Sequence, residues 1–112
     1  MIEKTVLDYL NEKMEVPVYM ERPEQPESEY VLVEKTSGRR SNHIGSATIA
    51  LQSYAGSLLL AAELNEEVIA AMEEIVSLDE IIGVSLNSTY NFTDTSRKQY
   101  RYQAVYDIRH YL

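Results

Sequence analysis

The chain has 112 residues, of which 45% are hydrophobic, and a formal net charge of −8. A chain of this length buries roughly 60–70% of its unfolded surface, enough for one core, so we expect a single domain over residues 1–112. The acidic balance argues against a basic nucleic-acid grip, the absence of cysteine excludes disulfides and thiolate metal sites, and no apolar run reaches the ~20 residues that span a membrane.

The N-terminal segment predicts an amphipathic helix. Ile2, Val6, Leu10 and Met14 recur every four residues, a spacing that places them on one helical face. Pro17 cannot continue the helix, which should therefore end at Met14 or at the residue after it. The same segment lacks the apolar stretch of a signal peptide, so an intracellular origin is the default expectation.

Extended structure is expected next. Residues 16–20 predict a short strand, and Pro17 suits an edge position because it cannot donate a ladder hydrogen bond. Residues 21–29, rich in proline and glutamate, predict an exposed connector. The β-rich runs 30–36 and 47–55 then predict two strands of a sheet.

The segment between these two strands, residues 37–45, is predicted as a loop. It contains two glycines, an asparagine and the basic pair Arg39–Arg40, followed by His43. A connection of about nine residues is too long for a tight hairpin, and long loops in compact domains are often functional.

A long helix is predicted from Leu58 to about Val76, with Ser57 as its N-cap. Its inward stripe, at spacings of three and four, comprises Ala61, Leu64, Val68, Ala71, Met72 and Ile75. Its outward side carries Glu63, Glu66, Glu67, Glu73 and Glu74. Leu58, Leu59 and Leu60 cannot all face one sheet, so at least one should meet the first helix or another chain.

The C-terminal third predicts a turn and two more strands. Residues 77–80 match a capping box that would start one short turn. Residues 82–90 and 100–110 show the alternation that is typical of strands. Residues 91–99, between them, predict a second long polar loop.

These elements predict an α+β fold: one domain with a mixed β-sheet of four to five strands, a long crossover helix and the N-terminal helix packed on it. The long helix, roughly 27 Å at ~1.5 Å per residue, matches a nine-residue strand at ~3.3 Å per residue. It can carry the chain back across the sheet, so strand 47–55 should run parallel to strand 82–90. The loops at 37–45 and 91–99 should then emerge at opposite ends of the sheet.

Charge is segregated by structural element. No lysine or arginine lies between Arg40 and Arg97, whereas eight carboxylates do. We therefore hypothesise contacts with partners or neighbouring copies at Arg39, Arg40, His43, Arg97, Lys98, Glu63, Glu67 and Glu74. Solubility alone would also explain the acidic helix face, and the nine tyrosines either cover the sheet or form subunit contacts.

No motif indicates catalytic chemistry. The two histidines lack metal-binding spacing, and the four isolated glycines do not form a phosphate-binding loop. Adjacent helical carboxylates point in different directions, which does not suit paired acid–base work. We expect no enzyme activity, no catalytic or metal-ligating residue and no cofactor.

The order and texture of the elements resemble those of the tail-terminator, or tail-completion, proteins of long-tailed bacteriophages and prophages. The two helices and five stretches carry the resemblance: Val16–Tyr19, Tyr30–Glu34, Ala47–Ala55, Gly83–Leu86 and Arg101–Ile108. The resemblance implies a small α+β subunit that forms a ring, typically a hexamer, on the end of the tail tube. Such proteins stop tube growth and provide the surface on which the head-side connector docks.

The resemblance implies partners as well as a role. They are further copies of the chain, the tail-tube protein and the head-side connector protein, with DNA only passing through the lumen and no membrane. The place of action would be the virion tail, after assembly in the host cytoplasm. Two alternatives stay open: a neck or head–tail connector ring subunit of the same particle, and a small soluble ligand-binding α+β domain with a closed apolar pocket.

Overall fold

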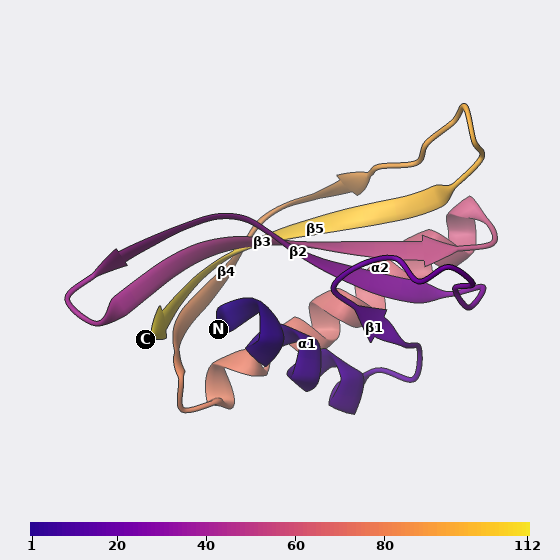
Figure 1. Cartoon of the computed structure of the whole chain (residues 1–112). Helices are drawn as coiled ribbons and strands as arrows, with labels where there is room; N and C mark the ends of the chain where they lie inside the picture. Colours follow the sequence, from indigo (N-terminus) through magenta and orange to yellow (C-terminus); the bar gives the residue numbers. More distant parts are fainter.

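A five-stranded mixed sheet runs through the molecule, and both helices pack against one of its faces (Figure 1). The computed structural model describes all 112 residues. In chain order the elements are α1 (Ile2–Lys13), β1 (Val18–Tyr19), β2 (Tyr30–Ser41), β3 (Ile44–Ala55), α2 (Leu58–Met72), the 3-10 helix η1 (Ile75–Ser77), β4 (Ile81–Asn91) and β5 (Tyr100–Tyr111). The predicted α+β architecture is confirmed.

The strand order is β1-β2-β3-β5-β4, in which β1 is parallel to β2 and all other neighbours are antiparallel. β5 lies between β3 and β4, so these two strands are not hydrogen-bonded to each other. They nevertheless run in the same direction, as predicted, because each is antiparallel to β5. The crossover from β3 to β4 is made by α2 and η1.

The core lies between the helices and one face of the sheet, called here the helix face; the opposite side is called the open face. The helices contribute Ile2, Val6, Leu10, Leu64, Val68 and Met72, and the sheet contributes Val31, Val33, Ile49, Leu51, Ala104, Tyr106 and Ile108. The predicted inward stripe of α2 is confirmed, except that Ala71 is only half-buried. The Tyr9 hydroxyl donates to the Ala71 carbonyl at 2.6 Å and ties α1 to α2.

Helix α1 ends where Pro17 predicted that it would. Met14 is its C-cap and is already extended. The Asn11 side chain then holds the following strand, because its amide donates to the Val18 carbonyl and its oxygen accepts from the Val18 N–H. β1 is only two residues long, shorter than predicted, but it lies at the edge of the sheet as expected.

The prediction of a nine-residue loop at 37–45 is wrong. β2 and β3 continue to Ser41 and Ile44, so the connection is the two-residue turn Asn42–His43. Both turn residues have positive φ, 50° and 67°, which is the backbone of a type I′ hairpin turn. Asparagine tolerates this conformation, and the polar composition of the flanking strands obscured it in the sequence.

Ser57 caps α2 as predicted, because its hydroxyl accepts from the Leu60 N–H at 3.1 Å. The α-helix ends earlier than expected, at Met72, and the chain continues into η1. The predicted short turn after Ser77 is present: Asp79 and Glu80 form a turn, closed by a hydrogen bond from the Ile81 N–H to the Leu78 carbonyl at 3.0 Å, and β4 begins there.

The molecule is elongated, with principal extents of 44 × 25 × 25 Å. The β2–β3 hairpin projects beyond the helices at one end, and the segment joining β4 to β5 lies at the other (Figure 1). The strand register agrees, since Ile44 is opposite Tyr111 whereas Ala55 is opposite Tyr100. The prediction that the two basic segments emerge at opposite ends is confirmed.

Candidate interaction surfaces

The projecting end of the β2–β3 hairpin, residues 35–48, is called here the arm. Arg39 and Arg40 alternate along β2, so their side chains leave on opposite faces of the arm. Arg40 is opposite Gly45, on the helix face, and Arg39 is opposite Ser46, on the open face. Both arginines are exposed and neither forms an ion pair within the chain. The arm therefore presents a positive charge on each face.

His110 packs against the arm near its tip. Its side chain lies over Gly45, where an added Cβ would collide with the imidazole, so the close approach of β5 requires glycine there. His110 is nine-tenths buried, and its Nδ1 lies 3.1 Å from the Tyr111 carbonyl oxygen. Burial separates the two histidines, because His43 lies exposed at the tip of the arm.

A cleft of about 630 Å³ lies between the arm and the start of α1. Most of its lining is polar or charged, including Lys35, Arg40, Glu3 and Glu80 beside His110. Groups of both signs line the same space, so the cleft has no consistent charge for a single ionic ligand. The ligand-binding alternative predicts an apolar pocket, which differs from this lining.

The outer side of α2 is acidic and unpaired. Glu63, Glu66, Glu67, Glu73 and Glu74 are all exposed, and none forms an ion pair within the chain. The only two ion pairs of the molecule lie elsewhere, between Lys4 and Asp8 and between Arg97 and Asp94.

These glutamates divide between two sides of α2. Burial, followed by the charges of Glu73 and Glu66, raises the pKa of Tyr106 to about 12. Asn65, next to Glu66, donates to Thr89 of β4 at 2.9 Å, which places this side of α2 toward β4.

Burial, followed by the charge of Glu74, raises the pKa of Tyr9. The Tyr9 hydroxyl donates to the Ala71 carbonyl, and Glu74, three residues after Ala71, lies on this α1 side of the helix. The acidic surface therefore borders both edges of the helical layer.

The start of α2 is apolar and uncovered. Leu58, Leu59 and Leu60 are 42%, 67% and 42% exposed. All three lie outside the core cluster, and the expected contact of at least one with the first helix or with another chain stays a prediction.

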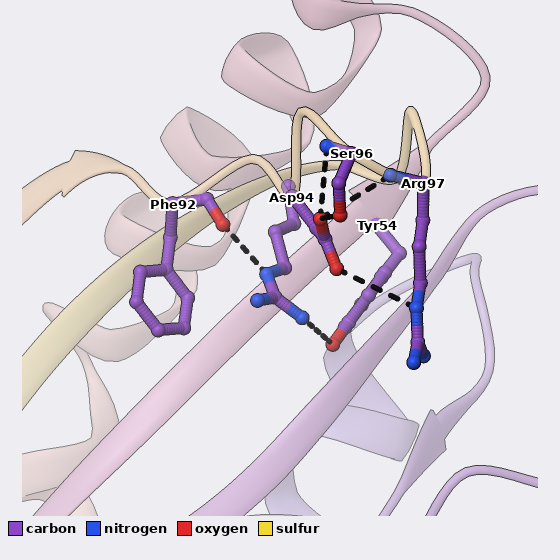
Figure 2. Close-up of polar contacts among 6 residues, drawn as sticks. Tyr54, Phe92, Asp94, Ser96 and Arg97 are labelled. Atoms are coloured by element: carbon purple, nitrogen blue, oxygen red, sulfur yellow. Dashed lines mark hydrogen bonds and ion pairs between the residues drawn. The ribbon is translucent and has the colours of Figure 1, made fainter.

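At the opposite end from the arm, an ordered turn presents Arg97 (Figure 2) and the next residue, Lys98. The Asp94 carboxylate accepts from the Ser96 hydroxyl at 2.7 Å and from the backbone N–H groups of Ser96 and Arg97. The Ser96 hydrogen bond, then those backbone bonds and the Arg97 charge, lower the pKa of Asp94. Asp94 and Gln99 pair across the turn, so most of the predicted loop is locally structured.

Arg101 anchors this turn to the sheet. Its Nε donates to the Phe92 carbonyl at 2.6 Å, and its Nη1 donates to the Tyr54 hydroxyl at 3.0 Å (Figure 2). The guanidinium carbon lies 4.5 Å from the Phe92 ring centroid, within the range of a cation–π contact. The turn is thereby fixed relative to β3 and β5.

A row of paired polar and aromatic side chains crosses the open face. Gln52 donates to Gln103 at 2.8 Å, and Gln103 donates to the Tyr90 hydroxyl. Tyr54 donates to Gln52 and stacks on Tyr30 with ring centroids 4.7 Å apart. Because these side chains form hydrogen bonds with one another, the open face is ordered although no helix covers it.

The eight residues hypothesised as contacts do not form one site. Arg39, Arg40 and His43 lie on the arm; Arg97 and Lys98 lie at the far end; Glu63, Glu67 and Glu74 lie on α2. Sequence reasoning missed the row on the open face and the anchoring role of Arg101. The sequence did carry one sign of this row. Gln52 and Gln103 are each adjacent to a core residue of the same strand, so their side chains leave on the opposite face of the sheet.

No protein-family model matches this chain, and no curated protein shows significant sequence similarity to it. Within the structure, no three histidine, cysteine, aspartate or glutamate side chains gather as a metal-ion cluster. Neither helix has the length and apolar character needed to cross a membrane.

Proposed function

We propose that this chain is a structural ring-forming subunit of a phage or prophage particle, a tail terminator. Copies of it would sit as a ring, with six as the expected number, at the head-proximal end of the tail tube. The ring would stop growth of the tube and join it to the head-side connector.

One observation carries this proposal: separate charged surfaces lie at the two ends and along one side of an elongated subunit. The arm presents Arg39 and Arg40 at one end, and the turn at 94–99 presents Arg97 and Lys98 at the other. A ring between two partners needs a docking surface above and another below, and this arrangement supplies both.

The acidic side of α2 supports contact between copies. Its glutamates lack intramolecular partners and belong to the same chain as unpaired arginines on the arm. A ring uses heterologous contacts, in which one surface of a subunit meets a different surface of the next. Complementary charge on the two surfaces would set the orientation and register of that contact.

The charge balance supports passage of DNA through a lumen. A net charge of −8 disfavours tight binding to phosphates, so DNA would pass the ring without adhering to it. No membrane has a part in this proposal.

Deletion of the coding sequence from the phage or prophage that carries it tests the proposal directly. Electron microscopy of the resulting particles should show tail tubes of abnormal length that lack heads. Tails of normal length without attached heads would assign the chain to the neck or connector ring instead. Normal, infectious particles would refute both structural roles.

A further inference from the structure

The outer edge of β4 is unpaired along its whole length. β4 is the last strand of the sheet, and its only strand partner is β5. Ile81–Asn91 contains no charged residue and no proline, two of the means by which an edge strand avoids pairing, although its pairing with β5 shifts register twice, at Ile81/Gly83 and Leu86/Ser88. Leu86 and Tyr90 on this strand are each 42% exposed. A long uncharged edge of this kind is a template for another strand.

A second free edge lies on the arm. β1 pairs only with Val31 and Leu32, so residues 33–41 of β2 have a neighbour on the β3 side alone. This open stretch of nine residues is comparable in length with the eleven residues of β4. The chain thus carries two long unpaired strand edges on opposite sides of one sheet.

The directions of the strands suit contact between these edges. β2 runs antiparallel to β3, and β3 runs in the direction of β4, so β2 and β4 run in opposite directions. A neighbouring copy related by rotation about an axis along the strands keeps its strand directions. Its β2 would therefore meet β4 as an antiparallel pair, the more stable of the two pairings.

Charge on the helix face is complementary across such a contact. The Asn65 side chain of α2 donates to the Thr89 hydroxyl of β4 at 2.9 Å, and Glu66 follows Asn65 with Glu73 two helical turns further on, so these glutamates lie on the β4 side of α2. On the arm, Lys35 and Arg40 both line the cleft on the helix face. None of these four charged groups has an ion-pair partner in its own chain.

The spacing of the two charge pairs is also similar. Glu66 and Glu73 are seven helical residues apart, roughly 10 Å at ~1.5 Å per residue. Lys35 and Arg40 are opposite Ile49 and Gly45 of β3, which are four residues apart, roughly 14 Å at ~3.4 Å per residue. Long flexible basic side chains span the difference.

From these observations we propose that the free edge of β4 pairs with the free edge of β2 in a second copy of this chain. The sheet then continues from subunit to subunit, and the arm lies beside α2 of its neighbour. The contact is heterologous. Each subunit uses its β4 edge, called here the receiving edge, for one neighbour and its β2 edge, called here the donating edge, for the other. The inference rests on the proposed function only for closure of the ring. The edge pairing itself is argued from the two unpaired strand edges and from the directions of their strands.

The first test introduces a charge on the receiving edge. Leu86→Lys places an ammonium group on the helix face of β4, at a position that is 42% exposed in the folded monomer. The wild-type protein should form oligomers larger than a dimer, and this variant should not. Leu59→Lys makes the same change at a more exposed site away from both edges, at the start of α2, which the edge pairing leaves to a partner other than the neighbouring copy, so it should leave oligomers intact. Sedimentation velocity gives the mass, and circular dichroism checks the fold of each variant.

The second test uses the heterologous character of the contact. Lys35→Glu with Arg40→Glu should abolish association through the donating edge. Mixed with the Leu86→Lys variant, each chain retains the one intact edge that the other lacks. The mixture should therefore give a one-to-one heterodimer, although each variant alone is a monomer.

Several results would overturn the inference. A dimer formed by the arm variant alone would show that two β4 edges pair with each other. Loss of oligomers in the Leu59→Lys variant, with oligomers retained in Leu86→Lys, would move the contact to the start of α2. A wild-type protein that stays monomeric at all concentrations would exclude self-pairing. Rings that persist in both edge variants would refute the edge pairing without affecting the proposed terminator role. Normal tails in the deletion mutant would refute the terminator role without affecting the edge pairing.

Discussion

Val68 is the residue at which the packing of α2 is most directly tested. It lies at the middle of the inward stripe, is fully buried, and belongs to the single core cluster that joins both helices to the sheet. No basic residue occurs on α2, so a carboxyl group introduced there has no helical partner with which to form an ion pair. Val68→Asp should therefore unfold the domain.

The magnitude follows from two contributions. Burial of a valine side chain contributes roughly 1.5–3 kcal/mol, which the substitution removes. An unpaired polar group in the same place costs roughly 2–7 kcal/mol more. The sum, roughly 4–10 kcal/mol, is comparable with the whole stability of a domain of this size, on the order of 6–17 kcal/mol at about 0.05–0.15 kcal/mol per residue.

Thermal unfolding followed by circular dichroism measures this effect. Val68→Ala should give a graded loss of roughly 2 kcal/mol, from two methyl groups and the cavity that they leave, and lower Tm by about 8–16 °C. Glu67→Gln, at the exposed neighbouring position, should change stability by less than about 0.5 kcal/mol. A Val68→Asp protein that melts like the wild type would refute the assignment of this helix face to the core.

Three further predictions follow from the contacts described above. Asn11→Ala removes both hydrogen bonds to β1 and should lower the free energy of unfolding by about 1–3 kcal/mol in urea titrations, whereas Glu12→Ala at the next exposed position should not. The pKa of Tyr106 is raised in the folded state to about 12, from 10.0, so its contribution to stability is complete below pH 10 and falls as the pH rises toward 12; Tyr106→Phe should flatten that part of the pH–stability profile, and an unchanged profile would contradict the cause given. Arg39→Glu with Arg40→Glu should leave Tm within a few degrees of wild type but reduce the yield of complete particles in a complementation assay, and an undiminished yield would exclude a docking role for the arm.

The helices and the sheet class could be predicted because their signals are local. The four-residue spacing from Ile2 to Met14, stopped by Pro17, is sufficient to define α1 to within a residue. Ser57 and the inward stripe define α2 in the same way. In both helices the apolar residues recur every three or four positions because one side of the helix packs on the sheet. This spacing can be read from the sequence without knowledge of the fold.

The arm could not be predicted because its strands bury little. From Glu34 to Ser41 every residue of β2 is exposed, so no apolar alternation marks it as a strand. What holds it is backbone pairing with β3 and the Asn42–His43 turn, and asparagine followed by histidine is a weaker hairpin signal than asparagine followed by glycine.

The presence of separate acidic and basic surfaces could be predicted from the sequence, but their positions on the fold could not. Sequence reasoning identified segregated charge, yet the side of α2 on which each glutamate lies depends on the contacts of this helix with Thr89 and Tyr9. The free edge of β4 depends on strand order, because inserting β5 between β3 and β4 is what leaves β4 outermost. Strand order arises from contacts distant in sequence, which local patterns do not express.

The account as a whole requires that this chain acts by associating with copies of itself and with its neighbours in a particle. Solution mass of the purified wild-type protein, with and without tail-tube protein, tests that requirement most directly. The expected result is a closed oligomer with a mass that is a fixed multiple of the single chain and that binds the tube protein. A monomer that remains alone at every concentration and never joins the tube protein would contradict it.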